Sequence, residues 1–351
     1  MKRDKLLNAV IEDIFSGVYG NAGSVFPSIR GLSAKLGVSP ATAKSVIDAL
    51  REKNLIVTKG NKNYLYHREI GKDSALCLRR KKSGFIGVFV PDIQNMFFAI
   101  LAKNIQFFVC ASGYNAILMT ESKDFGFKNA LDCFEKLGVE AAIVAPWSSE
   151  KNFRRRTYPV ILVATDTETN IYDKITIDNH LAGKTAADLL YKGGYEKFFV
   201  IGIAKIDENN PRVAGFISRT KELGVEFNES DLIKIGDTED LPYKIRELVS
   251  KNSDKSIGLF CYHDILANRV LETCRKNGYG VPEKIGIVGC DNLPIPEDKI
   301  KITTIAYSVR EMAKEAVELA KTRIAGDDAP KKARVIPFFV YKKNSVKKTE
   351  N

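Results

Sequence analysis

Three polar side chains in the first fifth of the chain have the types and spacing needed to contact a nucleic-acid duplex. Arg30 can donate two parallel hydrogen bonds to guanine, Thr42 offers a hydroxyl and a methyl group, and Lys44 can hold a phosphate. The alternative for each is a solvated surface side chain, the usual state of charged residues. The charge distribution and the elements around these residues favour the first interpretation.

Positive charge is concentrated at the amino terminus. The first 82 residues hold 16 of the 54 Lys and Arg but only 7 of the 43 Asp and Glu, so they carry +9 of the chain's formal charge of +11. An electropositive module attracts a polyanion by releasing its counterions, whereas a nearly neutral domain does not. We therefore expect a small polyanion-binding head on a larger body. The run Arg79 to Lys82 is either a hydrated linker or a second phosphate contact, and we take it as a linker.

The elements expected in the head form a winged helix-turn-helix. An apolar stripe at helical spacing ends at Ser16-Gly17, a second helix stops at Gly37, and Ser39-Pro40 starts a third as N-cap and first helical residue. Two short strands then flank a basic turn. The expected helices and strands lie at residues 6–15, 29–36, from Pro40 past Leu50, 55–58 and 64–66. The second of two helices joined in this way normally lies in the major groove.

The letters F-P-S-I-R-G-L-S-A-K-L-G-V-S-P-A-T-A-K, followed by A-L-R-E-K-N-L-I, resemble the GntR-type DNA-binding domain. The resemblance implies that Arg30 contacts DNA, that Thr42 and Lys44 lie on the exposed face of the recognition helix, and that the wing approaches the minor groove. Pro40 departs from the family, which usually has an arginine there. We expect residues 1–68 to form this domain and residues 69–83 a linker. The expected DNA contacts are Arg30, Ser39, Thr42, Lys44, Lys59, Asn61 and Lys62.

From residue 84 onward, short apolar runs alternate with helical stretches. Continuous Val, Ile and Phe runs separated by helices indicate parallel strands buried on both faces, the doubly wound α/β arrangement. Two such sets predict two lobes within residues 84–345, followed by a tail at 346–351. The first set lies at 85–90, 115–119, 141–145 and 159–163, and the second at 198–203, 232–235, 257–261 and 285–290. Ligands of such sheets gather at the carboxyl ends of the strands, which here should face a common cleft.

Several side chains at the expected strand ends could bind a hydroxyl-rich small molecule. A guanidinium fork such as Arg212 and a carboxylate such as Asp264 can each bind paired hydroxyls, and aromatic rings can cover the C–H faces of a sugar. We expect the small-molecule contacts to come from Asp92, Asn95, Phe97, Phe98, Trp147, Arg212, Asp264 and Tyr307.

A series of motifs in the body resembles the LacI/GalR regulators and the related periplasmic sugar-binding proteins. The motifs are I-G-V-F-V-P-D-I-Q-N-M-F-F-A-I-L, I-D-N-H-L-A-G, L-L-Y-K-G-G-Y-E-K, P-R-V-A-G-F, H-D-I-L-A-N, G-I-V-G-C-D-N and T-T-I, in the family order. With the head, the chain resembles the arabinose-repressor group of bacterial regulators. The resemblance implies that Asn95, Phe97 or Phe98, Arg212, Asp264 and Tyr307 line an effector cleft.

Other roles are open for some of these residues. Phe97 or Phe98 could belong to the core, Arg212 and Asp264 could form a structural ion pair with each other, and Trp147 could be a rim or interface residue instead of a stacking platform.

The sequence also departs from the LacI pattern at three places. Tyr307 replaces a common glutamine, His263 replaces the asparagine before the aspartate, and Ala164-Thr165 replaces an Asp-containing pair. These departures leave the usual hexose or pentose specificity open.

Two other classes of function fit the sequence less well. A solute-binding protein of the periplasmic type without a DNA role requires export, for which we find no signal, and the basic head would be unexplained. An α/β enzyme would need a nucleotide or nucleophile motif, and G-x-G-x-x-G, G-x-x-x-x-G-K-[ST] and G-x-S-x-G do not occur. We expect no enzymatic activity and no cofactor.

The remaining expectations concern the state of the protein. Six cysteines without a CxxC pair and only three histidines fit a reduced cytoplasmic protein without a metal site, and no segment is apolar enough to span a membrane. We expect a homodimeric transcriptional regulator, in the commoner pattern a repressor. Its affinity for double-stranded operator DNA would change when the two lobes close on a small effector, for which a carbohydrate is the expected class.

Overall fold

The computed structural model describes residues 2–15, 17–20, 23–52, 55–65, 83–146, 153–167, 169–204, 206–236, 240–295 and 299–348. The expected linker, except Ser83, and Trp147 lie outside the described residues. Contacts between residues divide the chain into two units, Met1–Ser83 and Gly84–Asn351.

The first unit consists of helices and a small antiparallel sheet. Its elements, in chain order, are α1 (Lys2–Phe15), β1 (Val25–Phe26), α2 (Ile29–Leu36), α3 (Pro40–Glu52), β2 (Ile56–Lys59) and β3 (Lys62–Leu65). The strands are hydrogen-bonded in the order β1-β3-β2. Helices α2 and α3 with the β2–β3 hairpin form a winged helix-turn-helix.

The turn between α2 and α3 has clear local causes. The Ser28 side chain caps α2 by accepting a hydrogen bond from the Gly31 amide, and Gly37 ends α2 at a φ of 63° in the left-handed region that favours glycine. The Ser39 hydroxyl then accepts a hydrogen bond from the Thr42 amide at the start of α3. Apolar side chains of α1, α2, α3 and the sheet, including Val10, Leu32, Val46, Leu50 and Leu65, form the core of this unit.

The first lobe of the second unit is built on a six-stranded sheet. Its strands are β4 (Phe85–Val90), β5 (Asn115–Thr120), β6 (Ala141–Val144), β7 (Val160–Val163), β8 (Asp173–Thr176) and β14 (Ala333–Val335), in the parallel order β14-β8-β7-β6-β4-β5. Helices α5 (Met96–Ala111) and α11 (Val309–Ile324) pack on one face, where Ile86 and Val88 belong to their core cluster. Helix α6 (Phe127–Leu137) packs on the other face with Phe89 and Val144.

The second lobe repeats this architecture. Its strands are β9 (Lys197–Ile203), β10 (Leu232–Ile235), β11 (Ile257–Cys261), β12 (Ile285–Cys290), β13 (Thr303–Tyr307) and β15 (Phe338–Tyr341), in the order β10-β9-β11-β12-β13-β15. One face carries α7 (Asn179–Lys192) and α8 (Pro211–Glu222), and the other carries α9 (Asp240–Lys251) and α10 (Asp264–Lys276). A short 3-10 helix, η1 (Glu229–Asp231), precedes β10.

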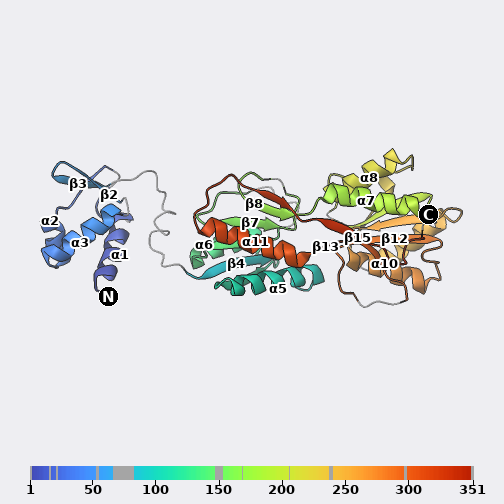
Figure 1. Ribbon diagram of the computed structural model, residues 1–351, viewed down its shortest axis with the longest axis horizontal. Helices are drawn as coiled ribbons and strands as arrows, with labels where there is room; N and C mark the ends of the chain where they lie inside the picture. The colour runs from blue at the N-terminus through green and yellow to red at the C-terminus, as the bar shows by residue number, and fades with distance from the viewer. Residues whose placement is uncertain are drawn as a thin grey trace. The chain divides into compact units, whose positions relative to one another are not determined.

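The chain passes between the lobes three times: between β8 and α7, between β13 and α11, and between β14 and β15 (Figure 1). Each lobe is therefore built from segments that are distant in the sequence. The three crossings begin at the carboxyl ends of β8, β13 and β14.

The fold class expected from the sequence, a winged helix-turn-helix followed by two doubly wound lobes, is confirmed by this architecture. Strand β15 differs from the expected all-parallel pattern because it runs antiparallel to β13 at the sheet edge. Strands β8, β14 and β15 were not expected. β8 and β14 are only three or four residues long and lack a continuous apolar run, whereas β15 is a short apolar run that the sequence analysis did not assign. Among the described helices, none has both the length and the apolar character needed to cross a bilayer.

Candidate functional site

A cavity of about 260 Å³ lies where the strand ends of the two lobes meet. Its wall combines side chains of the first lobe, the second lobe and the crossing segments. The lining residues are Asn95, Phe97, Phe98, Pro146, Ala164, Thr165, Asp166, Thr176, Ile177, Asn179, Ile203, Ile206, Arg212, Tyr262, His263, Ile265, Asp291, Tyr307 and Met312. Concave sites of this kind, mostly apolar with a few convergent polar groups, are typical ligand sites.

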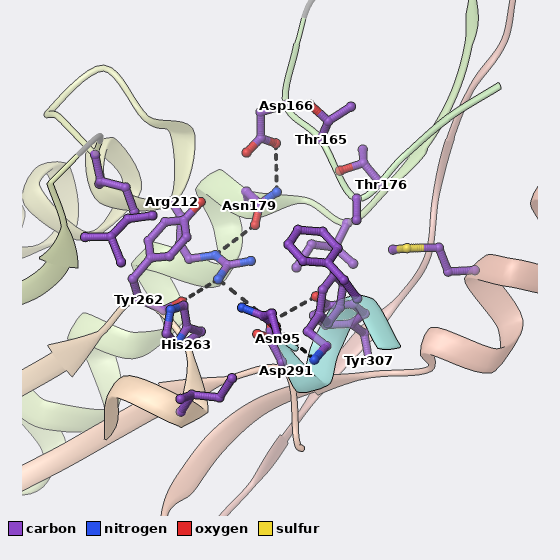
Figure 2. Close-up of a pocket in the computed structure, with 18 of the residues that line it drawn as sticks. Asn95, Thr165, Asp166, Thr176, Asn179, Arg212, Tyr262, His263, Asp291 and Tyr307 are labelled. Atoms are coloured by element: carbon purple, nitrogen blue, oxygen red, sulfur yellow. Dashed lines mark hydrogen bonds and ion pairs between the residues drawn. The ribbon is translucent and has the colours of Figure 1, made fainter. Parts of the chain in front are cut away.

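Arg212 is the central charged group of the cavity (Figure 2). The side chain is buried, and three contacts with two residues fix it. Nε donates to Asn179 Oδ1 at 2.9 Å, Nη1 donates to the Tyr262 carbonyl at 2.6 Å, and the guanidinium carbon lies 4.6 Å from the centre of the Tyr262 ring. No hydrogen bond within the described residues occupies Nη2. A guanidinium held in this way is preorganised to donate to a bound ligand.

The close approach of α7 and α8 places Arg212 beside Asn179. A β-carbon on Gly183 would lie 2.0 Å from the Arg212 carbonyl oxygen, and one on Gly215 would lie 2.0 Å from the His180 carbonyl oxygen. Only glycine at both positions permits the backbones to come this near. The glycines of the two sequence motifs therefore bring the first turns of α7 and α8 together, and with them the polar side chains at the cavity.

Asp291 is held between Arg212 and Tyr307. One carboxylate oxygen accepts a hydrogen bond from the Tyr307 hydroxyl at 2.9 Å and lies 3.9 Å from Arg212 Nη1. Burial, reinforced by Asp291, raises the pKa of Tyr307 well above its ordinary value, so the phenol stays a donor. Asp291 has a φ of 102° and Ala164 a φ of 52°, a left-handed conformation that non-glycine residues rarely adopt and that concentrates at functional sites.

Aromatic rings form another part of the wall. Phe97 and Phe98 both line the cavity, with ring centres 5.3 Å apart, and Phe97 lies 6.3 Å from Tyr307. Phe97 also belongs to the main core cluster, so the core and cavity roles considered from the sequence coincide in it. The Asn95 side chain caps α5 by accepting from the Phe97 amide at 3.0 Å, and its amide nitrogen is left to face the cavity.

His263 caps α10 through Nδ1, which accepts a hydrogen bond from the Leu266 amide at 3.1 Å. Burial lowers the pKa of the imidazole, so the neutral ring, with its proton on Nε2, is the form that lines the cavity.

Two candidates from the sequence lie away from the cavity in the described structure. Asp264 lies behind β12 and β13, where its carboxylate accepts hydrogen bonds from the Thr304 hydroxyl at 2.7 Å and the Leu293 amide at 3.0 Å. Burial raises its pKa to about 7. Asp92 is exposed and caps its own turn by accepting from the Gln94 amide. Trp147 lies outside the described residues. Arg212, for which an ion pair with Asp264 was an open alternative, has Asp291 as its carboxylate neighbour.

The sequence reasoning also missed polar residues that line the cavity. Asp166, Thr176, Asn179, Tyr262 and Asp291 were not proposed as contacts, although Asn179 and Asp291 belong to quoted motifs. Asp166 comes directly after the Ala164-Thr165 pair where we noted the absence of an expected aspartate, and its carboxylate accepts a hydrogen bond from Asn179 Nδ2 at 2.7 Å. An aspartate one residue after the expected position was the sequence signal that could have identified Asp166.

The expected DNA contacts all lie in the first unit. Arg30 is exposed in the first turn of α2, and Lys44 is exposed on α3. Thr42 is half-buried and shares a hydrogen bond with the Ser39 hydroxyl, which acts as the cap of α3. The remaining three contacts, Lys59, Asn61 and Lys62, are exposed at the β2–β3 turn.

Comparisons with known proteins agree with this architecture. Residues 187–346 match the family described as a periplasmic binding protein-like domain. The chain is 24% identical over 312 residues to the HTH-type transcriptional repressor PurR of Photobacterium profundum, covering 85% of this chain and 92% of that protein. It is 26% identical over 321 residues to the ribose operon repressor of Lactococcus lactis, covering 88% of this chain and 94% of that protein.

Solved structures show the same fold in the second unit. A LacI family transcriptional regulator from Enterococcus faecium, crystallised with bound ribose, superposes with a TM-score of 0.64 at 24% identity, covering 75% of this chain and 98% of that one. The second unit therefore contains a periplasmic binding protein-like domain, and over most of its length the chain is similar to transcriptional regulators of the LacI type.

Proposed function

We propose that this chain is a DNA-binding repressor whose affinity for its operator changes when a small hydroxylated ligand, a sugar or sugar derivative, binds between the two lobes. The observation that carries the proposal is the buried Arg212, which Asn179 and the Tyr262 carbonyl hold at the cavity and whose Nη2 makes no hydrogen bond to the described residues. A buried guanidinium with spare donors is costly unless a ligand uses them. The relatives named as a ribose operon repressor and a regulator with bound ribose support a sugar as the class.

The first unit supplies the DNA-binding surface in this proposal, and we assign it to the GntR type of winged helix. In support, a hairpin follows α3 directly and carries Lys59 and Lys62 at its turn. Arg30 and Lys44 are exposed and make no ion pair in the described structure, so both are available to contact DNA. Ser39 contributes by fixing the first turn of α3, since its hydroxyl is engaged with Thr42.

The lobes couple the two activities through their crossings. Asn95 and Phe97 belong to the first lobe, whereas Arg212 and Asp291 belong to the second, so a ligand that contacts both sets favours the closed arrangement. In a homodimer, closure changes the spacing of the two DNA-binding units and hence the affinity for a two-fold operator.

The second copy in this proposal binds the edge of the first lobe. Strand β5 is an edge strand, Leu118 on it is exposed, and the neighbouring helix α5 exposes Phe107, over which Arg310 is stacked at 4.8 Å. Sedimentation equilibrium of the full chain tests this surface: a homodimer is expected, and Phe107→Asp should shift it toward monomer.

The function is tested with the full chain and a random duplex library. Selected duplexes are measured by fluorescence anisotropy at increasing salt, and the affinity should fall linearly on a double-logarithmic plot because counterions are released. A sugar that stabilises the chain in calorimetry should then change the affinity for the selected duplex by about 5- to 150-fold. A chain that selects no sequence, or that binds duplexes with no dependence on salt, would refute the proposal.

A further inference from the structure

The cavity has an unequal distribution of charge. Among the described residues, the charged lining groups are one cation, Arg212, and two carboxylates, Asp166 and Asp291. His263 is neutral, since burial lowers its pKa. Asp291, 3.9 Å from Nη1, offsets the charge of Arg212. Asp166 has no cationic partner in the described structure, so the described lining groups carry a net formal charge of about −1.

Helix amino termini at the cavity do not reverse this balance. Four helices begin there, and a free helix amino terminus attracts anions through its unpaired N–H groups. In each case a side chain already accepts one of these hydrogen bonds: Asn95 caps α5, Asp178 caps α7, Asn210 caps α8 and His263 caps α10. Each capping side chain therefore occupies a backbone N–H group that could otherwise donate to a phosphate or carboxylate of the ligand.

Polar groups of the first lobe form a distinct part of the wall. Thr176, the last residue of β8, lines the cavity, is 6% exposed, and its hydroxyl oxygen is buried without a hydrogen-bond partner. Figure 2 shows Asp166 and Thr176 on the same side of the cavity, away from Asp291 and Tyr307. One oxygen of Asp166 accepts from Asn179 Nδ2 at 2.7 Å, and no hydrogen bond in the described structure occupies the other.

The buried Thr176 hydroxyl without a partner carries a desolvation cost that a bound group can remove, and the half-buried Asp166 carboxylate offers an open acceptor beside the cavity. The Thr176 hydroxyl can donate or accept, whereas the Asp166 carboxylate only accepts. A ligand that satisfies both must place a hydrogen-bond donor here, which a hydroxyl or an ammonium group does and a phosphate dianion does not.

We propose that Asp166 and Thr176 form a subsite that receives a hydroxyl or ammonium donor of the ligand, so that the cavity takes uncharged or cationic polyols and rejects their phosphorylated or carboxylated derivatives. This inference rests on the proposed ligand-responsive function and defines the ligand class and two residues that set it.

The test is a set of paired compounds measured with the full chain by thermal shift and calorimetry. The probes are D-ribose, D-glucose, D-glucosamine and cellobiose, together with ribose 5-phosphate, glucose 6-phosphate and gluconate. Ribose or glucose, where it binds, should bind at least about tenfold more tightly than its anionic counterpart, and glucosamine and cellobiose extend the set to a cationic and a larger neutral ligand. A phosphate ester or carboxylate that binds more tightly than its parent overturns the inference and leaves the proposed function standing.

Two substitutions separate the subsite from a general effect on folding. Asp166→Asn should weaken the best neutral probe by about tenfold and also reduce its preference over the matched phosphate, because the repelling charge is gone. Thr176→Val should weaken the same probe while leaving or raising the melting temperature of the free chain, because a buried unpartnered hydroxyl is removed. Asp124→Asn and Thr185→Val, at an exposed loop and on the surface of α7, are the matched controls and should change neither quantity.

The outcomes are distinguishable. If Asp166→Asn keeps both the affinity and the preference of the wild type, the subsite is refuted although the chain still binds a sugar. If Thr176→Val lowers the melting temperature of the free chain and does not weaken the probe, the hydroxyl is structural and the inference is wrong. If no compound in the set binds the wild type, the proposed sugar-responsive function itself fails, and the inference fails with it.

Discussion

Replacing Gly183 with alanine tests whether the contact between α7 and α8 positions the cavity. A β-carbon at this position would lie 2.0 Å from the Arg212 carbonyl oxygen and 2.7 Å from the Phe216 amide nitrogen, whereas real β-carbons essentially never approach closer than 3.0 Å. The helices must therefore move apart by about 1 Å. Such a shift is enough to break the 2.9 Å hydrogen bond between Arg212 and Asn179.

The sign of the stability change shows which of two opposing effects of Gly183→Ala is larger, the gain in helix propensity or the clash between α7 and α8. Alanine is favoured over glycine in a helix interior by about 1 kcal/mol, whereas forcing extra volume into a packed contact costs about 1–3 kcal/mol. Because the contact is backbone to backbone, no side-chain rotation can relieve it, and we place the cost at the upper end. We expect the free energy of unfolding of the second unit to fall by about 1–2 kcal/mol.

Calorimetric melting of the full chain measures this change, and titration with a sugar that stabilises the wild type measures the cavity. Gly31→Ala is the control, because a β-carbon there meets its nearest atom at 3.5 Å inside helix α2, and its melting temperature should stay level or rise. The reasoning is refuted if Gly183→Ala melts at or above the wild-type temperature and binds the sugar normally.

Three further predictions concern stability and DNA binding. Arg323 is buried and donates two hydrogen bonds to Asp173 at 2.7 and 2.9 Å, so Arg323→Met should lower the free energy of unfolding by about 3–5 kcal/mol in urea, and an unchanged midpoint would contradict this role. The pKa of Asp264 is raised from 3.8 to about 7 by burial and then by Asp291, so its contribution to stability is full below pH 4 and is lost as pH rises through 7. Asp264→Asn should remove about 2–3 kcal/mol of that pH dependence between urea melts at pH 5 and 8, because about two pH units of the interval up to 7 lie in this range, and an identical slope in the variant would count against it. Arg30→Ala and Lys44→Ala should each weaken binding to the selected duplex in anisotropy, and Lys44→Ala should lower the slope of log affinity against log salt by about 1, while sugar affinity is unchanged. A loss of sugar binding would show that DNA binding and sugar binding do not belong to separate units.

The sequence was sufficient for the elements whose signals are local. The Gly37 stop and the Ser39-Pro40 start define the helix-turn-helix, and continuous apolar runs define the inner strands. The short edge strand β14 depends on a partner far along the chain, Asp173–Thr176, and no local pattern identifies it. Strand β15 has a readable apolar run, but its antiparallel pairing with Thr303–Tyr307 depends on the fold.

The site was also predicted only where its signals are local. Arg212 follows a proline that begins a helix at a strand end, a position readable from the chain. Asp264 and Asp291 are both strand-end carboxylates, and nothing in the sequence says which one faces the cavity. The choice depends on backbone conformation, since Asp291 adopts a φ of 102° that directs it toward Tyr307, whereas Asp264 follows the helix cap formed by His263.

The most direct test of the central claim is the affinity of the full chain for its selected duplex, measured with and without a saturating sugar that calorimetry shows to be bound. The account predicts a change of about 5- to 150-fold in the wild type, and no change in Arg212→Gln at the same sugar concentration. Equal duplex affinity in the presence and absence of the bound sugar would contradict it.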